Sequence, residues 1–451
     1  MTELLSIILA AGEGTRMRSD IPKVLHQVGG LPIVGHVVNA AIGAGSTRVA
    51  LVTGPGHDAV RTAISAAAPA VKFFEQLERK GTGHAASMAR EAFDDFDGYI
   101  AVVYGDHPLL RPENFQGVLD RLDDGWDAAI LGFEPRDTLT YGRLITDGDR
   151  LLAIREHKDA TPAEREIGLC NACILTFRAE VFRSLIDKLD ANNAAGEYYL
   201  TDLVELANAA GYKVSYAVAP EVDVMGVNDR AQLARAEAQF QELRRDDFMK
   251  AGVTLKDPST VYFSYDTEIG RDVTIFPNVV FGPGVKIADG VEIRAFCDIE
   301  GATIGSGSTI GPFARMRGGA ELGDAVHIGN FVEVKNAVIH DGVKAGHLSY
   351  LGDAEIGAKT NIGAGTITCN YDGVNKSKTT IGANAFIGSN SSLVAPVTIG
   401  DGAYIASGSV ITKDVEPDAL ALGRARQENK AGYAPKLKAR AEAIKRARSG
   451  K

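Results

Sequence analysis

Two segments of this chain have residue types and spacing that could bind a substrate or catalyse a reaction. The first lies near the N-terminus. Residues 9–16 have the sequence LAAGEGTR, and Lys23 follows shortly after. Glycines at positions 12 and 14 let the backbone approach a phosphate, and successive N–H groups there can form an anion-binding nest. Arg16 and Lys23 would neutralise a triphosphate. The pattern is neither a P-loop nor a dinucleotide fingerprint, so Gly-x-Gly by itself also fits a plain tight turn.

The second segment, residues 315–371, gathers polar side chains among sequence repeats that do not need them. His347 stands beside Lys344 and Tyr350, where the repeat pattern is interrupted. Histidine is the usual general base near neutral pH, and an amine substrate needs a base because its ammonium form is not a nucleophile. Alternatively, His347 is a surface histidine whose ring nitrogens are already hydrogen-bonded and which has no catalytic role.

The N-terminal half alternates apolar runs with segments of helical spacing. Residues 4–9, 48–53 and 99–104 are apolar on both faces and lead toward glycine, which is typical of buried parallel strands. The spacing predicts helices over 32–44 and 82–93. We therefore expect an α/β domain whose ligands bind at the carboxyl ends of the strands.

After Gly252 a six-residue period replaces the earlier pattern. It fits neither a helix nor a hairpin sheet, and it predicts a solenoid of short strands with about eight coils between positions 269 and 411. The period is lost between Thr368 and Ile381, so residues 369–378 should loop out. The recurring apolar residues are Ile269, Ile275, Phe281, Ile287, Ile293, Ile299, Ile304, Ile310, Met316, Leu322, Ile328, Val334, Ile381, Ile387, Leu393, Ile399, Ile405 and Ile411.

Composition limits the classes of protein that remain. A formal charge of −10 argues against a general nucleic-acid binder, because phosphate contacts need a basic surface. No apolar stretch approaches the roughly 18 residues of a membrane span, and the N-terminus lacks the basic region of a signal peptide. Cys170 and Cys173 form a lone C-x-x-C without the second pair of a zinc site. We expect a cytoplasmic protein of two or three domains with reduced thiols.

The end of the chain is basic. Residues 424–451 contain ten Lys or Arg and two Glu, which gives a net charge of +8. Two interpretations stay open: a solvated, partly disordered end, or a segment that covers an anionic ligand in an oligomer.

The string L-A-A-G-x-G-T-R-M with a downstream Pro-Lys is similar to the sugar-nucleotide pyrophosphorylases. Together with the hexapeptide repeats, the chain resembles, over essentially its full length, the GlmU family of bacterial bifunctional uridylyltransferases and acetyltransferases. The other motifs that carry this resemblance are Gln76, Gly81-Thr82-Gly83-His84-Ala85, Tyr104-Gly105-Asp106, Tyr141-Gly142-Arg143, Glu156-His157-Lys158, Asn171, Gly196-Glu197-Tyr198-Tyr199-Leu200-Thr201-Asp202 and Gly226-Val227-Asn228.

For the N-terminal half, the resemblance implies uridylyl transfer from UTP to N-acetylglucosamine-1-phosphate with release of pyrophosphate. This reaction needs charge neutralisation and in-line positioning rather than a covalent protein group. Mg²⁺, a hard ion that prefers oxygen ligands, would be held by Asp106 and Asn228. Contacts to UTP and the UDP-sugar would come from Leu9, Ala10, Gly12, Gly14, Arg16, Lys23, Gln76, Gly81, Thr82, Tyr104, Gly142, Glu156, Asn171 and Asn228.

For the C-terminal half, the resemblance implies N-acetylation of glucosamine-1-phosphate by acetyl-CoA. His347 would be the general base, and Glu333 the carboxylate that orients it. The family's solenoid is left-handed and trimeric with sites between subunits, so a homotrimer is expected. Sugar-phosphate contacts would come from Arg317, Lys335, Tyr350 and Asn361, and acetyl-CoA contacts from Ala364, Asn370, Tyr371, Ser389, Ser407 and Arg424.

The resemblance also implies domain limits and a cellular role. A Rossmann-like α/β nucleotidyltransferase domain would span residues 1–228, a linker helix 229–250, a left-handed parallel β-helix with the acetyltransferase site 251–424, and a basic tail 425–451. The product, UDP-N-acetylglucosamine, would serve peptidoglycan and lipopolysaccharide synthesis, and hence cell wall biogenesis and cell shape.

Two rival functions and several departures from the family pattern remain. A single-function pyrophosphorylase with a regulatory β-helix would not need the polar series at 315–371. A non-catalytic subunit should lose Arg16, Lys23 and Asp106, which this chain retains. The departures are Glu13, an acid in a phosphate loop that is expected to point to solvent, together with His107, the Cys170–Cys173 setting of Asn171, Gly318 and Ser407.

Overall fold

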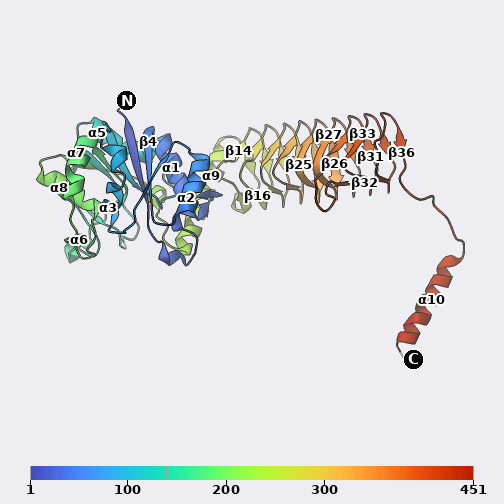
Figure 1. Cartoon of the computed structure of the whole chain (residues 1–451), viewed down its shortest axis with the longest axis horizontal. Helices are drawn as coiled ribbons and strands as arrows, with labels where there is room; N and C mark the ends of the chain where they lie inside the picture. Colours follow the sequence, from blue (N-terminus) through green and yellow to red (C-terminus); the bar gives the residue numbers. More distant parts are fainter. Residues whose placement is uncertain (1, 139, 450–451) are drawn as a thin grey trace. The chain divides into compact units, whose positions relative to one another are not determined.

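The computed structural model describes residues 2–138 and 140–449, so the last two residues of the basic tail lie outside it. These residues form two compact units. The first consists of the chain up to residue 250 together with residues 262–267, and the second of residues 251–261 and 268 onward. The first is an α/β unit and the second a solenoid of short strands, as the two sequence periods predict (Figure 1).

A mixed sheet forms the centre of the first unit. β1 (Leu4–Ala10) lies between β4 (Ser46–Thr53) and β6 (Tyr99–Tyr104) and runs parallel to both. These are the three apolar runs predicted as buried strands. β10 (Cys170–Arg178) is antiparallel to β6, so the sheet is not parallel throughout. The strand order is β11 (Val214–Val218), β7 (Ala128–Phe133), β10, β6, β1, β4 and β5 (Lys72–Glu75), with β8 (Arg143–Asp147) pairing with β10 and β9 (Arg150–Arg155) pairing with β8.

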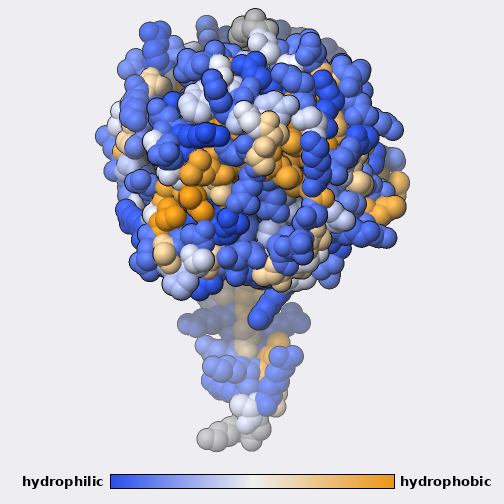
Figure 2. Space-filling model, turned by 90° about the vertical axis from the view of Figure 1, so that its left-hand side faces the viewer, coloured by the Kyte–Doolittle hydropathy of each residue, from blue (hydrophilic) through white to orange (hydrophobic). Residues whose placement is uncertain are grey.

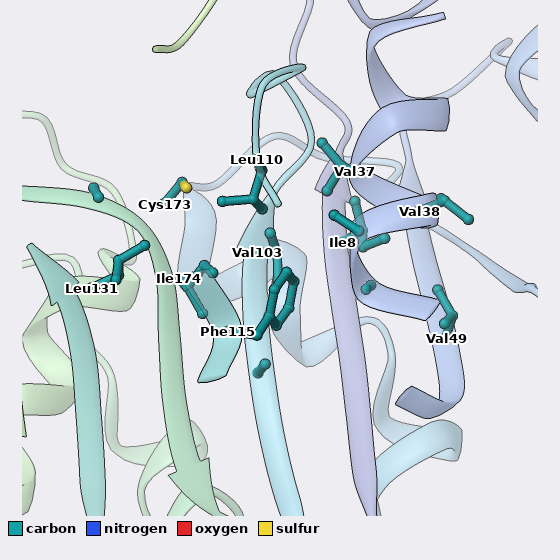
Figure 3. Packing of buried hydrophobic residues seen from close by; sticks show 14 of the residues in the cluster. Ile8, Val37, Val38, Val49, Val103, Leu110, Phe115, Leu131, Cys173 and Ile174 are labelled. Atoms are coloured by element: carbon teal, nitrogen blue, oxygen red, sulfur yellow. The ribbon is translucent and has the colours of Figure 1, made fainter. Parts of the chain in front are cut away.

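Both faces of this sheet are buried, which explains the continuous apolar runs. Ile8 packs with Phe115 in the core on one face (Figure 3), whereas Ile7 belongs to the core on the other. The side of the molecule that Figure 2 shows has a mostly hydrophilic surface. Among the helices that contribute to these cores, α1 (Ile33–Gly43) and α5 (Pro112–Asp123) pack on the Ile8 side, and α7 (Ala179–Leu185) and α8 (Leu203–Ala209) on the Ile7 side.

The helix predicted over residues 82–93 is two short helices, α3 (Thr82–Ser87) and α4 (Arg90–Phe93), and that prediction was wrong in this respect. Between them, the N–H groups of Met88 and Ala89 bond to carbonyls three residues earlier, in the tighter 3-10 pattern. The apolar spacing of this short segment suits both geometries, so the sequence did not separate them.

The predicted connecting helix is α9 (Arg230–Lys250), and it packs within the first unit. The ring of Phe240 fills the space beside Gly29, where a β-carbon would lie 2.2 Å from it. The side-chain amide of Gln241 donates to the carbonyl of Phe263 and accepts from its N–H, both at 2.7 Å. The helix is therefore an integral part of the first unit rather than a free linker.

The second unit is a left-handed parallel β-helix. Ile275, Ile293 and Ile310 stack in register on successive coils. Of the recurring apolar residues, only Ile269 is not buried, so the inward orientation predicted from the period is confirmed. One face is a sheet of ten strands, eight of which lie between positions 269 and 411. The two strands outside that range, which the repeat did not predict, are β12 (Thr254–Leu255) and β36 (Leu420–Ala421).

The solenoid is interrupted at the predicted place. β29 (Ile367–Cys369) ends there, and β30 (Thr379–Ile381) resumes the ladder by pairing with β27 (Tyr350–Ile356). Between them, Tyr371 and Lys376 form an isolated antiparallel bridge. The inserted loop therefore leaves the coil and returns to it without disturbing the register.

All four cysteines are free thiols, and three of them are buried. Among the described residues, no helix combines the length and apolar character needed to cross a bilayer.

Candidate active sites

A cavity of about 290 Å³ opens at the carboxyl ends of the central strands of the first unit. β1 ends there in Leu9 and Ala10, and β6 ends there in Tyr104. The fold thus places the glycine loop where an α/β domain binds its ligands. The predicted residues that line the cavity are Leu9, Ala10, Gly12, Lys23, Gln76, Gly81, Thr82, Tyr104 and Asp106; Arg79 and Glu197 line it without having been predicted.

Four polar side chains meet beside this cavity. The ammonium of Lys23 lies 2.5 Å from Oδ2 of Asp106 and donates to Oδ1 of Asn228 at 3.2 Å. Nη2 of Arg16 donates to the same Asn228 oxygen at 2.9 Å. Burial opposes ionisation of Asp106, but the positive charge of Lys23 and the contact with His107 outweigh it and hold its pKa far below the usual range. Asp106 is therefore a carboxylate across the physiological pH range.

The predicted magnesium ligands Asp106 and Asn228 direct their oxygens at one cation, the ammonium of Lys23. Within residues 2–138 and 140–449, no cluster of three His, Cys, Asp or Glu could hold a metal ion. Two oxygen donors suit Mg²⁺, which keeps several waters and takes its other ligands from substrate phosphates. The donor set fits a substrate-assisted magnesium site rather than a closed protein cage.

Gly81 and Thr82 contact the segment around Tyr198 and Leu200, which lies far from them in the sequence. A β-carbon at Gly81, whose φ is +109°, would lie 2.5 Å from the carbonyl oxygen of Tyr198, so the contact requires glycine. Oγ1 of Thr82 accepts from the N–H of Leu200 at 3.0 Å. The amide of Gln76 donates to the carbonyl of Gly81 at 3.1 Å. These bonds fix one wall of the cavity.

The residues predicted to hold the sugar also lie together. The carbonyl of Gly142 accepts from the N–H of Asn171 at 2.8 Å, and a β-carbon at Gly142 would come within 3.5 Å of the Glu156 carboxylate. Tyr104 shares a side-chain hydrogen bond with Asn171. Burial raises the pKa of Glu156, and a hydrogen bond of 3.1 Å from Thr201 partly offsets this.

A second cavity, of about 430 Å³, adjoins Glu156 and is rich in acidic side chains. Asp159, Asp190, Asp202 and Glu205 line it. Burial, followed by the charges of its acidic neighbours, raises the pKa of Asp202 to about 6. This side chain exchanges its proton closer to neutrality than an ordinary carboxyl does.

Glu13 is exposed, as predicted, with 58% of its side-chain surface accessible, and it also forms an ion pair with Arg79. Its Oε1 accepts from Nη1 of Arg79 at 2.6 Å, while Nε of Arg79 donates to the carbonyl of Ala11 at 2.8 Å. The acid in the glycine loop thus holds a guanidinium that also fastens the loop backbone. The sequence did not indicate this, because 66 residues separate the partners.

The solenoid carries the second group of predicted residues. Nδ1 of His347 lies 2.6 Å from Oδ1 of Asn330, its register partner on the preceding coil. Glu333 instead accepts from Nη1 of Arg317 at 2.9 Å. The orienting partner of His347 in this chain is therefore an amide, because Glu333 lies on a different face and aligns with Tyr350.

Positive charge concentrates beside the predicted sugar-phosphate residues. The pKa of Lys335 is lowered, first by Lys376 and then by Arg317, because three cations share one region. Lys376 comes from the inserted loop and was not predicted. The same loop places the amide of Asn370 against the carboxylate of Asp353. Such a cluster suits a phosphate.

The structure does not bring every predicted sugar-phosphate residue to one face. Arg317, Lys335 and Tyr350 lie on the fifteen-stranded sheet or at its edge, whereas Asn361 lies on the ten-stranded sheet. The phenol of Tyr371 donates to the carbonyl of Gly373 within its own loop and is largely exposed. A single chain therefore holds part of this site on each of two faces.

Four of the predicted residues, His347, Ala364, Ser389 and Ser407, form a column along one corner of the solenoid, whereas Asn370 and Tyr371 lie with the inserted loop. On the coil after His347, the carbonyl of Ala364 accepts from the N–H of Asn390 at 2.8 Å; on the next, that of Ser389 accepts from Gly408 at 2.8 Å. Ser407 follows on the next coil, so the column has one predicted residue per coil. Residues far apart in sequence thereby line a single track that begins at His347.

Fold and sites together define a nucleotidyltransferase unit joined to a hexapeptide-repeat transferase. The model of the MobA-like NTP transferase domain matches residues 6–191, and the bacterial transferase hexapeptide model matches 266–299, 301–336 and 378–413. The chain is 51% identical to the bifunctional protein GlmU of Jannaschia sp. over 99% of its own length and 98% of the relative's. For GlmU of Agrobacterium fabrum these values are 52%, 98% and 98%, and for that of Brucella anthropi 54%, 99% and 98%.

The chain therefore belongs to the GlmU family. It is a bifunctional enzyme of UDP-N-acetylglucosamine synthesis, with N-acetylglucosamine-1-phosphate uridylyltransferase and glucosamine-1-phosphate N-acetyltransferase activities.

Proposed function

We propose that the cavity of the first unit, within residues 1–228, carries out uridylyl transfer. The N–H groups of the glycine loop, with Arg16 and Lys23, neutralise the triphosphate of UTP. Gly142, Glu156 and Asn171 hold the sugar so that its phosphate oxygen attacks the α-phosphorus in line. The new P–O bond forms as the bond to pyrophosphate breaks. No covalent protein intermediate is needed.

Asp106 and Asn228 would hold Mg²⁺ in this cavity. When bound, the ion supplies neutralisation of the phosphate charge. The convergence of both side-chain oxygens on the ammonium of Lys23, at 2.5 and 3.2 Å, supports the assignment. Lys23 would then release these oxygens and bind phosphate, so it exchanges one anionic partner for another.

We propose that the solenoid, residues 251–424, transfers the acetyl group. Asn330 occupies Nδ1 of His347, which leaves Nε2 free to accept the proton from the amine of glucosamine-1-phosphate. The amine attacks the thioester carbonyl, the C–S bond breaks, and the thiolate of coenzyme A takes the proton back from His347. Arg317, Lys335 and Lys376 hold the sugar phosphate.

We also propose that the enzyme is a homotrimer. Asn361 lies on a different face from Arg317, Lys335 and Tyr350, so one chain does not present the whole predicted set on one surface. Asn361 of the partner subunit would complete the set. An assembly of this kind works in the cytoplasm, where it supplies UDP-N-acetylglucosamine for peptidoglycan and lipopolysaccharide.

The observation that carries the residue assignment is the presence of two separate polar sets, one in each compact unit. We expect Asp106→Ala to abolish uridylyl transfer and to leave acetyl transfer near normal. His347→Ala should lower acetyl transfer by about 10²- to 10⁴-fold and spare uridylyl transfer. Each activity is measured separately on the full chain, with thermal melts as the folding control.

Loss of both activities in one well-folded variant would contradict two independent sites. A regulatory solenoid would instead leave the wild type unable to consume acetyl-CoA with glucosamine-1-phosphate. The position of Asn361 gives a third test, because dissociation into monomers should remove acetyl transfer and preserve uridylyl transfer.

A further inference from the structure

The two oxygens of the Asp106 carboxylate have different partners. Oδ2 lies 2.5 Å from the ammonium of Lys23, and Oδ1 lies 2.8 Å from Nδ1 of His107. His107 directly follows Asp106 and is one of the residues at which this chain departs from the family pattern. An ionised carboxylate only accepts hydrogen bonds, so the proton of this contact lies on Nδ1. Oδ1 is therefore held by a ring next to it in the chain, whereas Oδ2 faces a cation on a flexible stem.

The contact between His107 and Asp106 is an electrostatic one at hydrogen-bond distance. The two residues are neighbours in the sequence, and within the part of the chain that the structure describes, Nδ1 of His107 has no partner of well-aligned hydrogen-bond geometry. The N–H dipole still attracts the carboxylate, because both groups are shielded from water: the side chain of His107 is 8% exposed and that of Asp106 21%. The carboxylate thus compensates a buried polar nitrogen.

The ring of His107 is confined at its opposite edge as well. A β-carbon at Gly226 would lie 3.2 Å from Nε2 and 3.4 Å from Cε1 of His107, so the backbone at Gly226 packs closely against the ring. The N–H of Val227 donates to the carbonyl of Asp106 at 2.9 Å. His107 therefore lies between the segment that carries Asp106 and the segment that leads to Asn228, the other proposed magnesium ligand.

The difference between the two carboxylate oxygens persists when Lys23 moves to the triphosphate, as proposed above. Lys23 then leaves Oδ2, but His107 stays against Oδ1, because its ring is buried and confined by Gly226. The carboxylate keeps its orientation. Oδ2 continues to face the position of the departed ammonium, from which Oδ1 of Asn228 lies 3.2 Å away.

Divalent ions differ in what they require from a carboxylate. Mg²⁺ keeps several waters and is bound through few carboxylate oxygens together with substrate phosphates. Ca²⁺ takes about six to eight oxygens and often binds both oxygens of one carboxylate. An ion that needs both oxygens of Asp106 competes with His107 for Oδ1, whereas an ion that needs only Oδ2 does not.

We propose that His107 is a positioning residue that reserves Oδ2 of Asp106 for the metal ion, and that it thereby favours Mg²⁺ over Ca²⁺. The proposal rests on the proposed role of Asp106 and Asn228 as metal ligands. Replacing a residue that orients a metal ligand typically changes metal affinity by about 10- to 100-fold. Because the contact of His107 is imperfectly aligned, we expect an effect at the lower end of this range.

The test measures Mn²⁺ binding to the full chain through the paramagnetic resonance signal of the free ion. UTP is present and the sugar phosphate is absent, so that no turnover occurs, and Mn²⁺ binding to UTP alone is subtracted. Mg²⁺ and Ca²⁺ are added as competitors, and the readout is the ratio of their dissociation constants. His107→Ala should lower the preference for Mg²⁺ over Ca²⁺ by about tenfold.

Two further variants separate the contact of Nδ1 from the volume of the ring. His107→Asn keeps an N–H at the place of Nδ1 and should recover most of the preference, whereas His107→Gln moves the N–H further out and should not. His36→Ala is the matched control for lost stability of the same unit. Nε2 of His36 donates to the carbonyl of Val28 at 2.8 Å, so this variant should melt at a lower temperature with an unchanged preference.

An unchanged preference in a folded His107→Ala would overturn the proposal, and so would an equal loss of affinity for all three ions. Recovery by His107→Gln rather than His107→Asn would show that the side chain only fills the space beside Gly226. If His107→Ala does not fold, the comparison of the Asn and Gln variants decides. If Asp106→Ala binds Mn²⁺ as the wild type does, the metal assignment itself is refuted, and this result is distinct from the others.

Discussion

Oδ1 of Asn330 lies 2.6 Å from Nδ1 of His347 on the adjacent coil. An amide oxygen only accepts hydrogen bonds, so the imidazole proton resides on Nδ1 and the lone pair on Nε2. A backbone of paired strands fixes both residues, since Asn330 and His347 are register partners. The imidazole is thus oriented by a neutral group that the repeat itself supplies.

Replacement of Asn330 by leucine should lower kcat of acetyl transfer by about tenfold, which corresponds to the loss of one hydrogen bond, and should leave the KM values close to wild type. Asn330→Asp retains an acceptor and should recover most of the rate. Steady-state kinetics of both variants, with uridylyl transfer as the internal control, checks this. A purely structural role of Asn330 would lower both activities or the melting temperature instead.

The Glu13–Arg79 pair should contribute to UTP binding through the glycine loop. We expect Arg79→Ala to raise the KM for UTP by several-fold, because it removes the bond to the Ala11 carbonyl as well as the ion pair. Glu13→Gln should have a smaller effect, since exposed ion pairs contribute about 0–1 kcal/mol. The KM values for UTP of both single variants and of the double variant give the coupling free energy between Glu13 and Arg79.

A matched control for this pair lies in the same segment. Lys80 pairs with Glu78 at the surface without a side-chain bond to the glycine loop. Lys80→Ala should therefore leave the KM for UTP unchanged. Equal effects of Lys80→Ala and Arg79→Ala would show that the segment acts only through its overall charge.

The stability of the first unit should depend on pH through Asp202. Its pKa is about 6 in the folded chain against 3.8 ordinarily, so the folded state binds more protons between these values. Stability contributed by this group is therefore full below about pH 4 and is lost as the pH rises to about 6. Asp202→Asn should melt at a higher temperature than wild type at pH 8 and close to it near pH 4. Equal melting temperatures at pH 8 would refute the assignment.

Removal of the chain after Gly423 should weaken acetyl transfer more than uridylyl transfer. The whole chain carries −10 and residues 424–451 carry +8, so the remainder carries −18 and repels an anionic donor. We expect the KM for acetyl-CoA to rise, and the rise to shrink at high salt, because exposed charges are screened. If the KM for acetyl-CoA is unaffected by the truncation, the tail is only a solvated end.

The interior of the solenoid could be predicted residue by residue, because every coil repeats one local constraint. Ile269 is the exception, since it belongs to the first turn of the series and has fewer coils to cover it. The strands at Leu255 and Ala421 escaped prediction because they fall outside the hexapeptide spacing. The six-residue period thus predicts the interior of the solenoid accurately, but it does not predict the strands at its two ends.

The partners of the site residues could not be predicted in the same way. Glu13 meets Arg79, and Lys376 reaches Lys335, through contacts that depend on how distant segments fold together. The polar motif around His347 led to the prediction that this residue is the base, but it did not indicate that Asn330 would face it. Whether the remaining predicted contacts bind substrate stays a prediction that the variants above test.

The loop at residues 369–378 begins and ends at one corner of the solenoid, and Ala354 pairs with Thr379 as if the coil had never been interrupted. A segment attached in this way can change its length or its side chains while the stacked interior keeps the same sequence requirements. Substrate preference can therefore diverge between relatives without a compensating change in the core. The same corner offers protein engineers a place to graft a new recognition loop beside Lys335 and Asp353.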